Sequence, residues 1–96
     1  MTYGELRAAL EVLGLGERAS LAEIRSRHRE LVKRFHPDSS DHDDPDAIRR
    51  INGAYRLVSD YVVSYRFSFA EAEFYEQNPD ERLRMQFEDA PLWGMR

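Results

Sequence analysis

Cysteine is absent from the 96 residues of this sequence. The chain therefore has no disulfide, no thiolate nucleophile and no cysteine-based zinc site, which fits a reducing compartment. It also lacks the roughly 20 consecutive apolar residues of a membrane span, and its first residues lack the basic start and apolar run of a secretory signal. We therefore expect a soluble, cytoplasmic protein that packing alone stabilises.

An excess of positive charge is absent as well, because the formal net charge is -4. This balance argues against general binding to nucleic acid or to an anionic membrane. The length fits one domain, or one domain with an appendage, and such a short chain buries only a small core. Internal repeats and low-complexity segments are also missing.

Two helices are predicted in the first third of the chain. Leu6, Ala9, Leu10 and Leu13 recur at helical spacing, and Gly14 and Gly16 then supply left-handed or irregular positions that end a helix. Ser20 followed by Glu23 is typical of a capping box, so the second helix should begin at Leu21. Pro37 should stop this helix, because proline disfavours helical geometry at the residue before it.

The second helix carries two separate stripes. The expected buried stripe consists of Leu21, Ile24, His28, Leu31, Val32 and Phe35. The other stripe is basic and consists of Arg25, Arg29 and Lys33, at steps of four residues. One face of this helix should therefore pack and another should present positive charge.

A third helix is predicted after an acidic loop. Asp43 or Asp44 can cap it, and Pro45 suits its first position. Its expected buried stripe consists of Ala47, Ile48, Ile51, Ala54, Tyr55, Val58 and Val62. The arginines Arg49, Arg50 and Arg56 should face solvent.

The remaining residues form an aromatic-rich extension. Residues 61–69 alternate aromatic and other side chains, and their secondary structure stays open. Asn78, Pro79 and the following acidic residues predict a short helix through about Phe87. Residues 89–94 should be extended. The sequence has no Gly- and Ser-rich linker before the extension, so we expect it to be packed.

Residues Ala19–Arg25, His28–Asp38 and Ile51–Asp60 together resemble the J-domain of DnaJ-type co-chaperones, with His36-Pro37-Asp38 as the central motif. The resemblance covers roughly residues 3–60. It implies an all-α fold in which two long antiparallel helices form a hairpin, with a short N-terminal helix and a short helical C-terminal extension. We accordingly expect a J-domain at residues 1–62 and a compact extension at residues 63–96.

The resemblance also implies a function. Members of the family bind a DnaK-type heat-shock chaperone and stimulate its ATP hydrolysis, and the family's Asp, here Asp38, pairs with an arginine of that partner. The partner-binding residues implied here are Arg25, Arg29, Lys33, His36, Pro37, Asp38 and Asn52. No cofactor or metal is expected, and no catalytic constellation indicates an enzyme.

Several positions depart from the family pattern. Glu30 and Ser39-Ser40 stand where basic residues or Asn are frequent, and the loop contains Asp41, Asp43, Asp44 and Asp46. His28 replaces a usual Tyr, and we expect it to be packed and hydrogen-bonded; a metal site with His36, His42 and the loop aspartates is the less favoured interpretation. The spacing of the loop also excludes the usual calcium-binding loop.

The aromatic residues of the extension allow two interpretations. They are Phe67, Phe69, Phe74, Tyr75, Phe87 and Trp93. They can enlarge a thin three-helix core, which we favour, or they can form a surface for a client protein. The second interpretation supports an alternative function, a J-like scaffold that binds partners through its extension without stimulating an ATPase.

Overall fold

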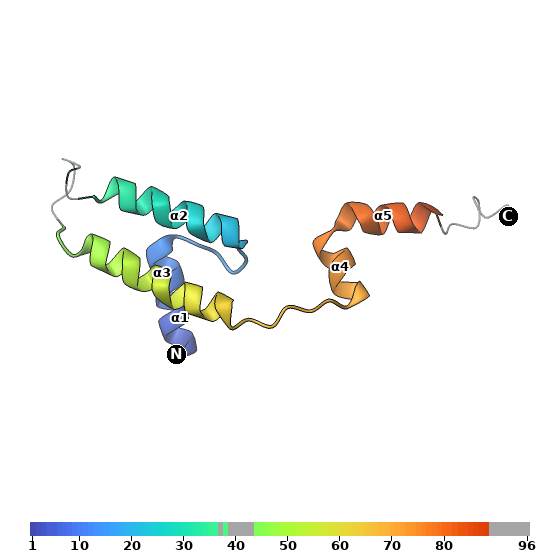
Figure 1. Ribbon diagram of the computed structural model, residues 1–96, viewed down its shortest axis with the longest axis horizontal. Helices are drawn as coiled ribbons and strands as arrows, with labels where there is room; N and C mark the ends of the chain where they lie inside the picture. Colours follow the sequence, from blue (N-terminus) through green and yellow to red (C-terminus); the bar gives the residue numbers. More distant parts are fainter. Residues whose placement is uncertain (37, 39–43, 89–96) are drawn as a thin grey trace. The chain divides into compact units, whose positions relative to one another are not determined.

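The computed structural model describes residues 1–36, 38 and 44–88 (Figure 1). Within these residues there are five helices and no strand: α1 (Tyr3–Leu13), α2 (Leu21–Arg34), α3 (Ala47–Val63), α4 (Glu71–Gln77) and α5 (Pro79–Glu88). The chain divides into two compact units, Met1–Tyr65 and Arg66–Arg96. The predicted all-α class is confirmed.

Local capping sets the limits of α1. The hydroxyl of Thr2 accepts a hydrogen bond from the backbone N–H of Glu5 at 3.1 Å. At the other end Gly14 has φ 68°, its N–H donates to the carbonyl of Glu11, and the N–H of Leu15 donates to the carbonyl of Leu10. These two bonds form a Schellman motif, so the predicted role of Gly14 is confirmed.

The capping box at the start of α2 is also confirmed. The N–H of Ser20 donates to Oε1 of Glu23 at 2.8 Å, and the N–H of Glu23 donates to Oγ of Ser20 at 3.1 Å. The backbone and side-chain hydrogen bonds with Ser20 hold the pKa of Glu23 below its ordinary value. The helix begins at Leu21 as predicted and ends at Arg34, while Pro37 lies outside the described residues.

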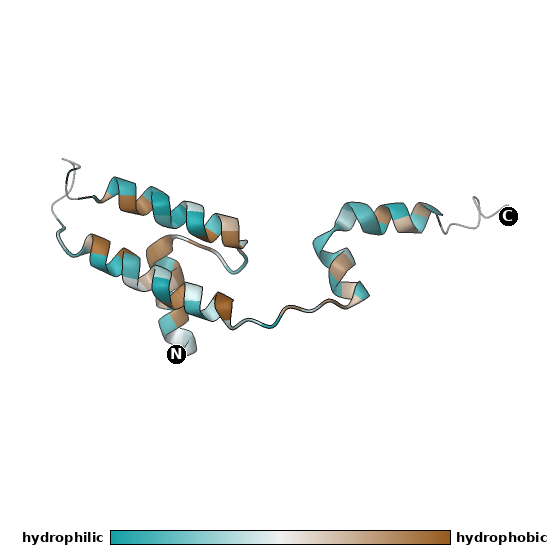
Figure 2. Cartoon of the chain, viewed as in Figure 1, coloured by the Kyte–Doolittle hydropathy of each residue, from teal (hydrophilic) through white to brown (hydrophobic). Residues whose placement is uncertain are grey.

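The helices α2 and α3 form the predicted antiparallel hairpin, since they lie side by side and run in opposite directions (Figure 1). The first helix, α1, packs mainly against α3 and less against α2. Apolar residues occur on all three helices (Figure 2). The buried core consists of Ala9, Leu13, Ile24, Leu31, Ile51, Ala54 and Val58.

The expected buried stripes need three corrections. Leu21, the first residue of α2, is 43% exposed. Leu15 and Leu57 pack against the core although neither was predicted to do so. Six further members of the stripes are half-buried: His28, Val32, Phe35, Ile48, Tyr55 and Val62.

The start of α3 also differs from the prediction. The helix begins at Ala47, and Pro45 lies in a turn before it. Oδ1 of Asp44 accepts the N–H of Asp46 at 3.0 Å, and the carbonyl of Asp44 accepts the N–H of Ala47 at 3.2 Å. Asp44 therefore closes a turn that displaces the helix start by two residues, whereas Asp43 lies outside the described residues.

The second unit contains α4 and α5. The predicted terminal helix is confirmed, because α5 begins at Pro79 and reaches Glu88. The helix α4 was not predicted. Asn78 lies between the two helices: its Nδ2 donates to the carbonyl of Phe74 at 2.8 Å, and its own carbonyl accepts from the N–H of Glu81 at 3.0 Å. One residue thus ends α4 and starts α5.

Four aromatic side chains of the extension are exposed, and their expected role in enlarging the three-helix core stays a prediction. Phe67, Phe69, Phe74 and Phe87 are between 49% and 92% exposed. No described residue of α4 or α5 is buried. Trp93 and the segment 89–94, which we expected to be extended, lie outside the described residues.

Candidate partner-binding site

His36 and Asp38 follow directly after α2. The side chain of Asp38 is 93% exposed and that of His36 is 53% exposed. The N–H of Asp38 donates to Nδ1 of His36 at 3.1 Å, and Oδ2 of Asp38 lies 3.6 Å from the same nitrogen. An unprotonated Nδ1 accepts the amide, whereas a protonated ring pairs with the carboxylate, so either form holds the two residues in one turn. Pro37 lies outside the described residues, and the carboxylate of Asp38 is open to a partner.

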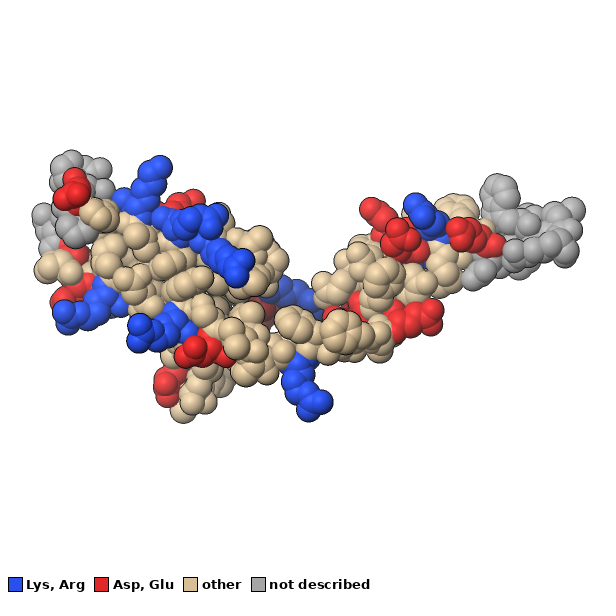
Figure 3. All heavy atoms as spheres, viewed as in Figure 1, with Lys and Arg blue, Asp and Glu red and all other residues tan. Residues whose placement is uncertain are grey.

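The basic stripe runs along α2 before this turn. Arg25, Arg29 and Lys33 are exposed and follow one another at four-residue steps. In the view of Figure 3, Lys and Arg side chains form a row over the position that α2 occupies in Figure 1. Arg25 and Arg29 form no ion pair with another described residue, so their charges face outward.

Arg27 and Glu30 have a different role on the same helix. Nε of Arg27 donates to the carbonyl of Leu13 at 2.8 Å, which satisfies a C-terminal carbonyl of α1. Nη1 of Arg27 pairs with Oε1 of Glu30. Glu30, one of the departures from the family pattern, is therefore paired with a residue outside the basic stripe. No sequence pattern predicted the contact between Arg27 and Leu13.

His28 joins α2 to α3. Its ring lies parallel to that of Tyr55, with centroids 3.9 Å apart and an interplanar angle of 4°. Its Nε2 lies 2.9 Å from Oδ1 of Asn52. The prediction of a packed, hydrogen-bonded histidine is confirmed. Asn52, one of the predicted partner-binding residues, is itself exposed.

Asp44 and Arg50 fix the far end of the loop that follows Asp38. Nη2 of Arg50 donates to Oδ2 of Asp44 at 2.5 Å. This hydrogen bond, together with the charge of Asp44, raises the pKa of the Arg50 guanidinium above its ordinary value. Both side chains are about half exposed, so the pair contributes little to global stability. Its local effect is to hold the start of α3.

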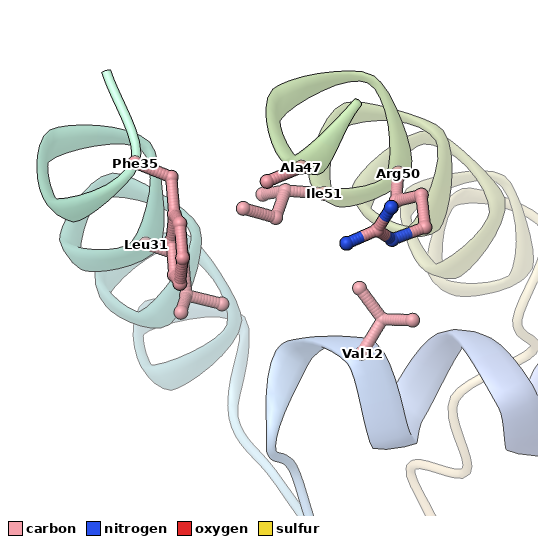
Figure 4. A pocket seen from close by; sticks show the side chains of 6 residues that line it. All are labelled: Val12, Leu31, Phe35, Ala47, Arg50 and Ile51. Carbon is pink, nitrogen blue, oxygen red and sulfur yellow. The ribbon is translucent and has the colours of Figure 1, made fainter. Parts of the chain in front are cut away.

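A shallow apolar hollow lies beside these residues (Figure 4). It is lined by Val12 of α1, Leu31 and Phe35 of α2, and Ala47, Arg50 and Ile51 of α3. Phe35, which directly precedes His36, packs against the core from this side. The packing of Phe35 fixes the point from which the chain leaves α2 toward Asp38.

The structure brings the predicted site residues together only in part. His36 and Asp38 lie in one turn, the three basic residues lie along α2, and Asn52 lies across the hairpin on α3. Within residues 1–36, 38 and 44–88, no three His, Asp or Glu side chains are grouped as metal ligands. The loop residues Ser39, Ser40, Asp41, His42 and Asp43 lie outside this range. In the part of the chain that the structure describes, no helix is long and apolar enough to cross a bilayer.

The antiparallel hairpin, the exposed histidine and aspartate beyond its first helix and the basic face of that helix define a small helical domain of the J type. The family model of the DnaJ domain matches residues 9–63, more than half of the chain. The chain belongs to this family.

Curated relatives support the same assignment. The chain is 33% identical over 78 residues to the chaperone protein DnaJ of Exiguobacterium sibiricum, a match that covers 80% of this chain and 20% of the relative. It is 38% identical over 52 residues to DnaJ of Finegoldia magna and 42% identical over 53 residues to DnaJ of Methanothermobacter thermautotrophicus; each match covers 52% of this chain and 14% of the relative. The matched region thus spans a fifth or less of these relatives. No solved structure matches the chain significantly.

Proposed function

We propose that the chain is a co-chaperone that binds a DnaK-type heat-shock chaperone and stimulates its ATP hydrolysis. The observation that carries the proposal is the 93% exposed carboxylate of Asp38, held beside His36 at the end of a rigid hairpin. Membership of the DnaJ-domain family supports the identity of the partner. The hydrolysis takes place in the partner, and no residue of this chain acts as a catalyst.

Asp38 acts in this proposal as the charged anchor. A carboxylate pairs with an arginine through two parallel hydrogen bonds, a geometry that requires both oxygens to be accessible. Loss of one member of such a desolvated pair costs about 2–5 kcal/mol of binding free energy. Because Asp38 is exposed in this chain, its replacement should remove this binding energy without unfolding the domain.

The basic stripe acts as the steering surface. Arg25, Arg29 and Lys33 present positive charge along α2, on the helix that leads to His36. A cationic helix raises the rate of association with an acidic partner surface, and added salt screens this effect.

The first test is single-turnover ATP hydrolysis by a DnaK-type chaperone, measured against increasing concentrations of this protein at several salt concentrations. We expect saturable stimulation that weakens with salt and that Asp38→Asn abolishes. Asp80→Asn, which removes the same charge from an exposed position of α5, is the matched control and should stimulate normally. Circular dichroism verifies that both variants are folded. Absence of stimulation by folded wild-type protein, with several chaperone paralogues tried, would refute the proposal.

A second function is favoured by the exposed rings of the extension. Phe67, Phe69, Phe74 and Phe87 are exposed apolar side chains, as expected of a client or scaffold surface. Binding of a partner through this surface should depend on Phe87 or Trp93 and not on Asp38. A pull-down that compares Phe87→Ala, Trp93→Ala and Asp38→Asn distinguishes this function from ATPase stimulation.

A further inference from the structure

The stacked pair of His28 and Tyr55 fixes the plane of the His28 ring. The centroids are 3.9 Å apart and the rings are nearly parallel, at 4°. Tyr55 itself packs against the core of the hairpin. The imidazole therefore has a set orientation, and its Nε2 points to Oδ1 of Asn52 at 2.9 Å.

The chemistry of this contact defines which way the amide of Asn52 faces. An amide oxygen only accepts, so Nε2 of His28 must carry the hydrogen, as it does both in the neutral Nε2–H tautomer and in the protonated ring. The NH2 group of Asn52 then lies on the opposite side of the planar amide. Because Asn52 is exposed, its two N–H donors are accessible to another molecule.

A second donor lies one helical turn further along α3. Arg56 is four residues after Asn52, so the two side chains are neighbours on the helix surface. A shallow hollow is lined by Asn52, Tyr55, Arg56, Ser59 and Asp60. Arg56 is exposed and forms no ion pair with any other described residue. The amide and the guanidinium together offer donors of the kind that bind a carboxylate.

We propose that His28 is a positioning residue that directs the NH2 group of Asn52 outward, where it binds, beside Arg56, a carboxylate of the chaperone partner. This inference rests on the proposed function and adds to it a second contact surface, on α3, with a defined chemical complement. This chain thereby binds the partner through the carboxylate of Asp38 and, on α3, through the amide of Asn52 and the guanidinium of Arg56. His28 acts only through Asn52.

The orientation of the amide is tested without any partner. Nitrogen-15 NMR of the whole chain should show the hydrogen of neutral His28 on Nε2. His28→Phe keeps an aromatic ring against Tyr55 but lacks the donor, so the side-chain amide signals of Asn52 should shift while the melting temperature stays close to that of the wild type. A hydrogen on Nδ1, with Nε2 unprotonated, would overturn the proposal, because Asn52 would then have to donate its NH2 group to His28.

The binding role is tested in the ATPase titration. Asn52→Asp keeps an acceptor toward His28 but replaces the outward donors by an oxygen. We expect the concentration for half-maximal stimulation to rise roughly tenfold or more, with the maximal stimulated rate unchanged, because a hydrogen bond to a charged group is lost. Gln86→Glu, an amide-to-acid change at an exposed position of α5, is the matched control and should have no effect.

A further comparison separates positioning from general stability. His28→Phe should raise the half-maximal concentration about threefold in the wild-type background and should cause no further rise when Asn52 is already Ala, because interacting residues are not additive. If Asp38→Asn abolishes stimulation but Asn52→Asp and Gln86→Glu have equal effects, this inference is refuted. The proposed function is then left intact. Absence of wild-type stimulation would refute the proposed function and, with it, the assignment of the partner's carboxylate.

Discussion

Gly14 is constrained both by its own backbone and by a neighbouring helix. Its φ of 68° lies in the left-handed region, which costs a residue with a side chain about 1–2 kcal/mol. A Cβ atom at this position would also lie 2.9 Å from Nη2 of Arg27, whose Nε donates to the carbonyl of Leu13. The side chain of Arg27 would have to move, and α1 would lose this contact with α2.

We therefore expect Gly14→Ala to lower the free energy of unfolding by about 1–2 kcal/mol. Gly53→Ala is the matched control, because Gly53 lies inside α3 and a Cβ atom there meets nothing within 4 Å. Alanine favours a helix over glycine by about 0.5–1 kcal/mol, so this variant should be more stable than the wild type. Urea denaturation of both variants measures the change in the free energy of unfolding, which should be negative for Gly14→Ala and positive for Gly53→Ala. A destabilised Gly53→Ala would contradict the open space around Gly53.

Individual site residues were predictable to different degrees. The sequence predicted the basic stripe because it depends on local spacing, whereas the role of Asp38 was implied by the family resemblance. It predicted a packed His28 but not its bond to Asn52, 24 residues away, because that partner depends on how α2 and α3 align. Arg50 was expected to face solvent, and it is exposed. Its bond to Asp44 depends on the turn before α3, which the spacing of apolar residues does not predict.

At the scale of the element, the capping box makes the stability of α2 depend on pH. The pKa of Glu23 is lowered in the folded chain, so its ionised form stabilises the fold above the ordinary pKa of 4.5 and this contribution is lost as the pH falls through the lowered value. Glu23→Gln retains an acceptor for the N–H of Ser20 but cannot ionise. We expect the free energy of unfolding of the wild type to fall more steeply below about pH 4.5 than that of Glu23→Gln. Parallel curves for the two proteins in urea titrations at stepped pH would contradict this.

The start of α3 provides a second prediction at this scale. Loss of the Arg50 guanidinium should remove one bond of Asp44 and loosen the turn that accepts the N–H groups of Asp46 and Ala47. We expect Arg50→Gln to accelerate amide hydrogen exchange at these two residues. Arg49→Gln removes the same charge from a neighbouring exposed residue that has no ion pair among the described residues, and it should leave their exchange rates unchanged.

Helix ends were predicted best where a single residue marks them locally. Gly14 and Ser20 act within their own turns, so the end of α1 and the start of α2 follow from local chemistry, whereas the cap at Thr2 was not predicted. The helix α4 follows Ala70, which makes no side-chain cap bond, and the aromatic residues before it suggested no period. The start of α3 was predicted two residues early, because proline at the first position is a preference and the Asp44 turn overrides it.

At the scale of the whole molecule, the chain contains two compact units with Arg66 at their boundary. Residues 65–70 belong to no helix, and Arg66 is exposed. Limited trypsin digestion should therefore cleave first after Arg66, although α2 and α3 contain many more basic residues. The N-terminal fragment should retain its helical signal, measured by circular dichroism, and the proposed stimulation of a chaperone, measured by the ATPase assay. Initial cleavage within α2 would show that the hairpin is less stable than its capping implies.

The same digestion bears on the role of the extension. A domain boundary near residue 62 stays a prediction, and the fragment tests it directly. If client binding depends on the exposed rings of Phe67, Phe69, Phe74 and Phe87, it should be lost with the second unit while stimulation is retained.

The packing of α1 mainly on α3 has a consequence for biosynthesis. A nascent chain that has emerged only through α2 cannot bury Leu13 fully, because the core residues Ile51, Ala54 and Val58 have not yet been made. Domains fold as units during synthesis, so the order of translation delays the native core until the second half of α3 is available. The turn with His36 and Asp38 is translated early but acquires its rigid support late. The proposed chaperone contact through this turn should thus be lacking in an incomplete chain on the ribosome.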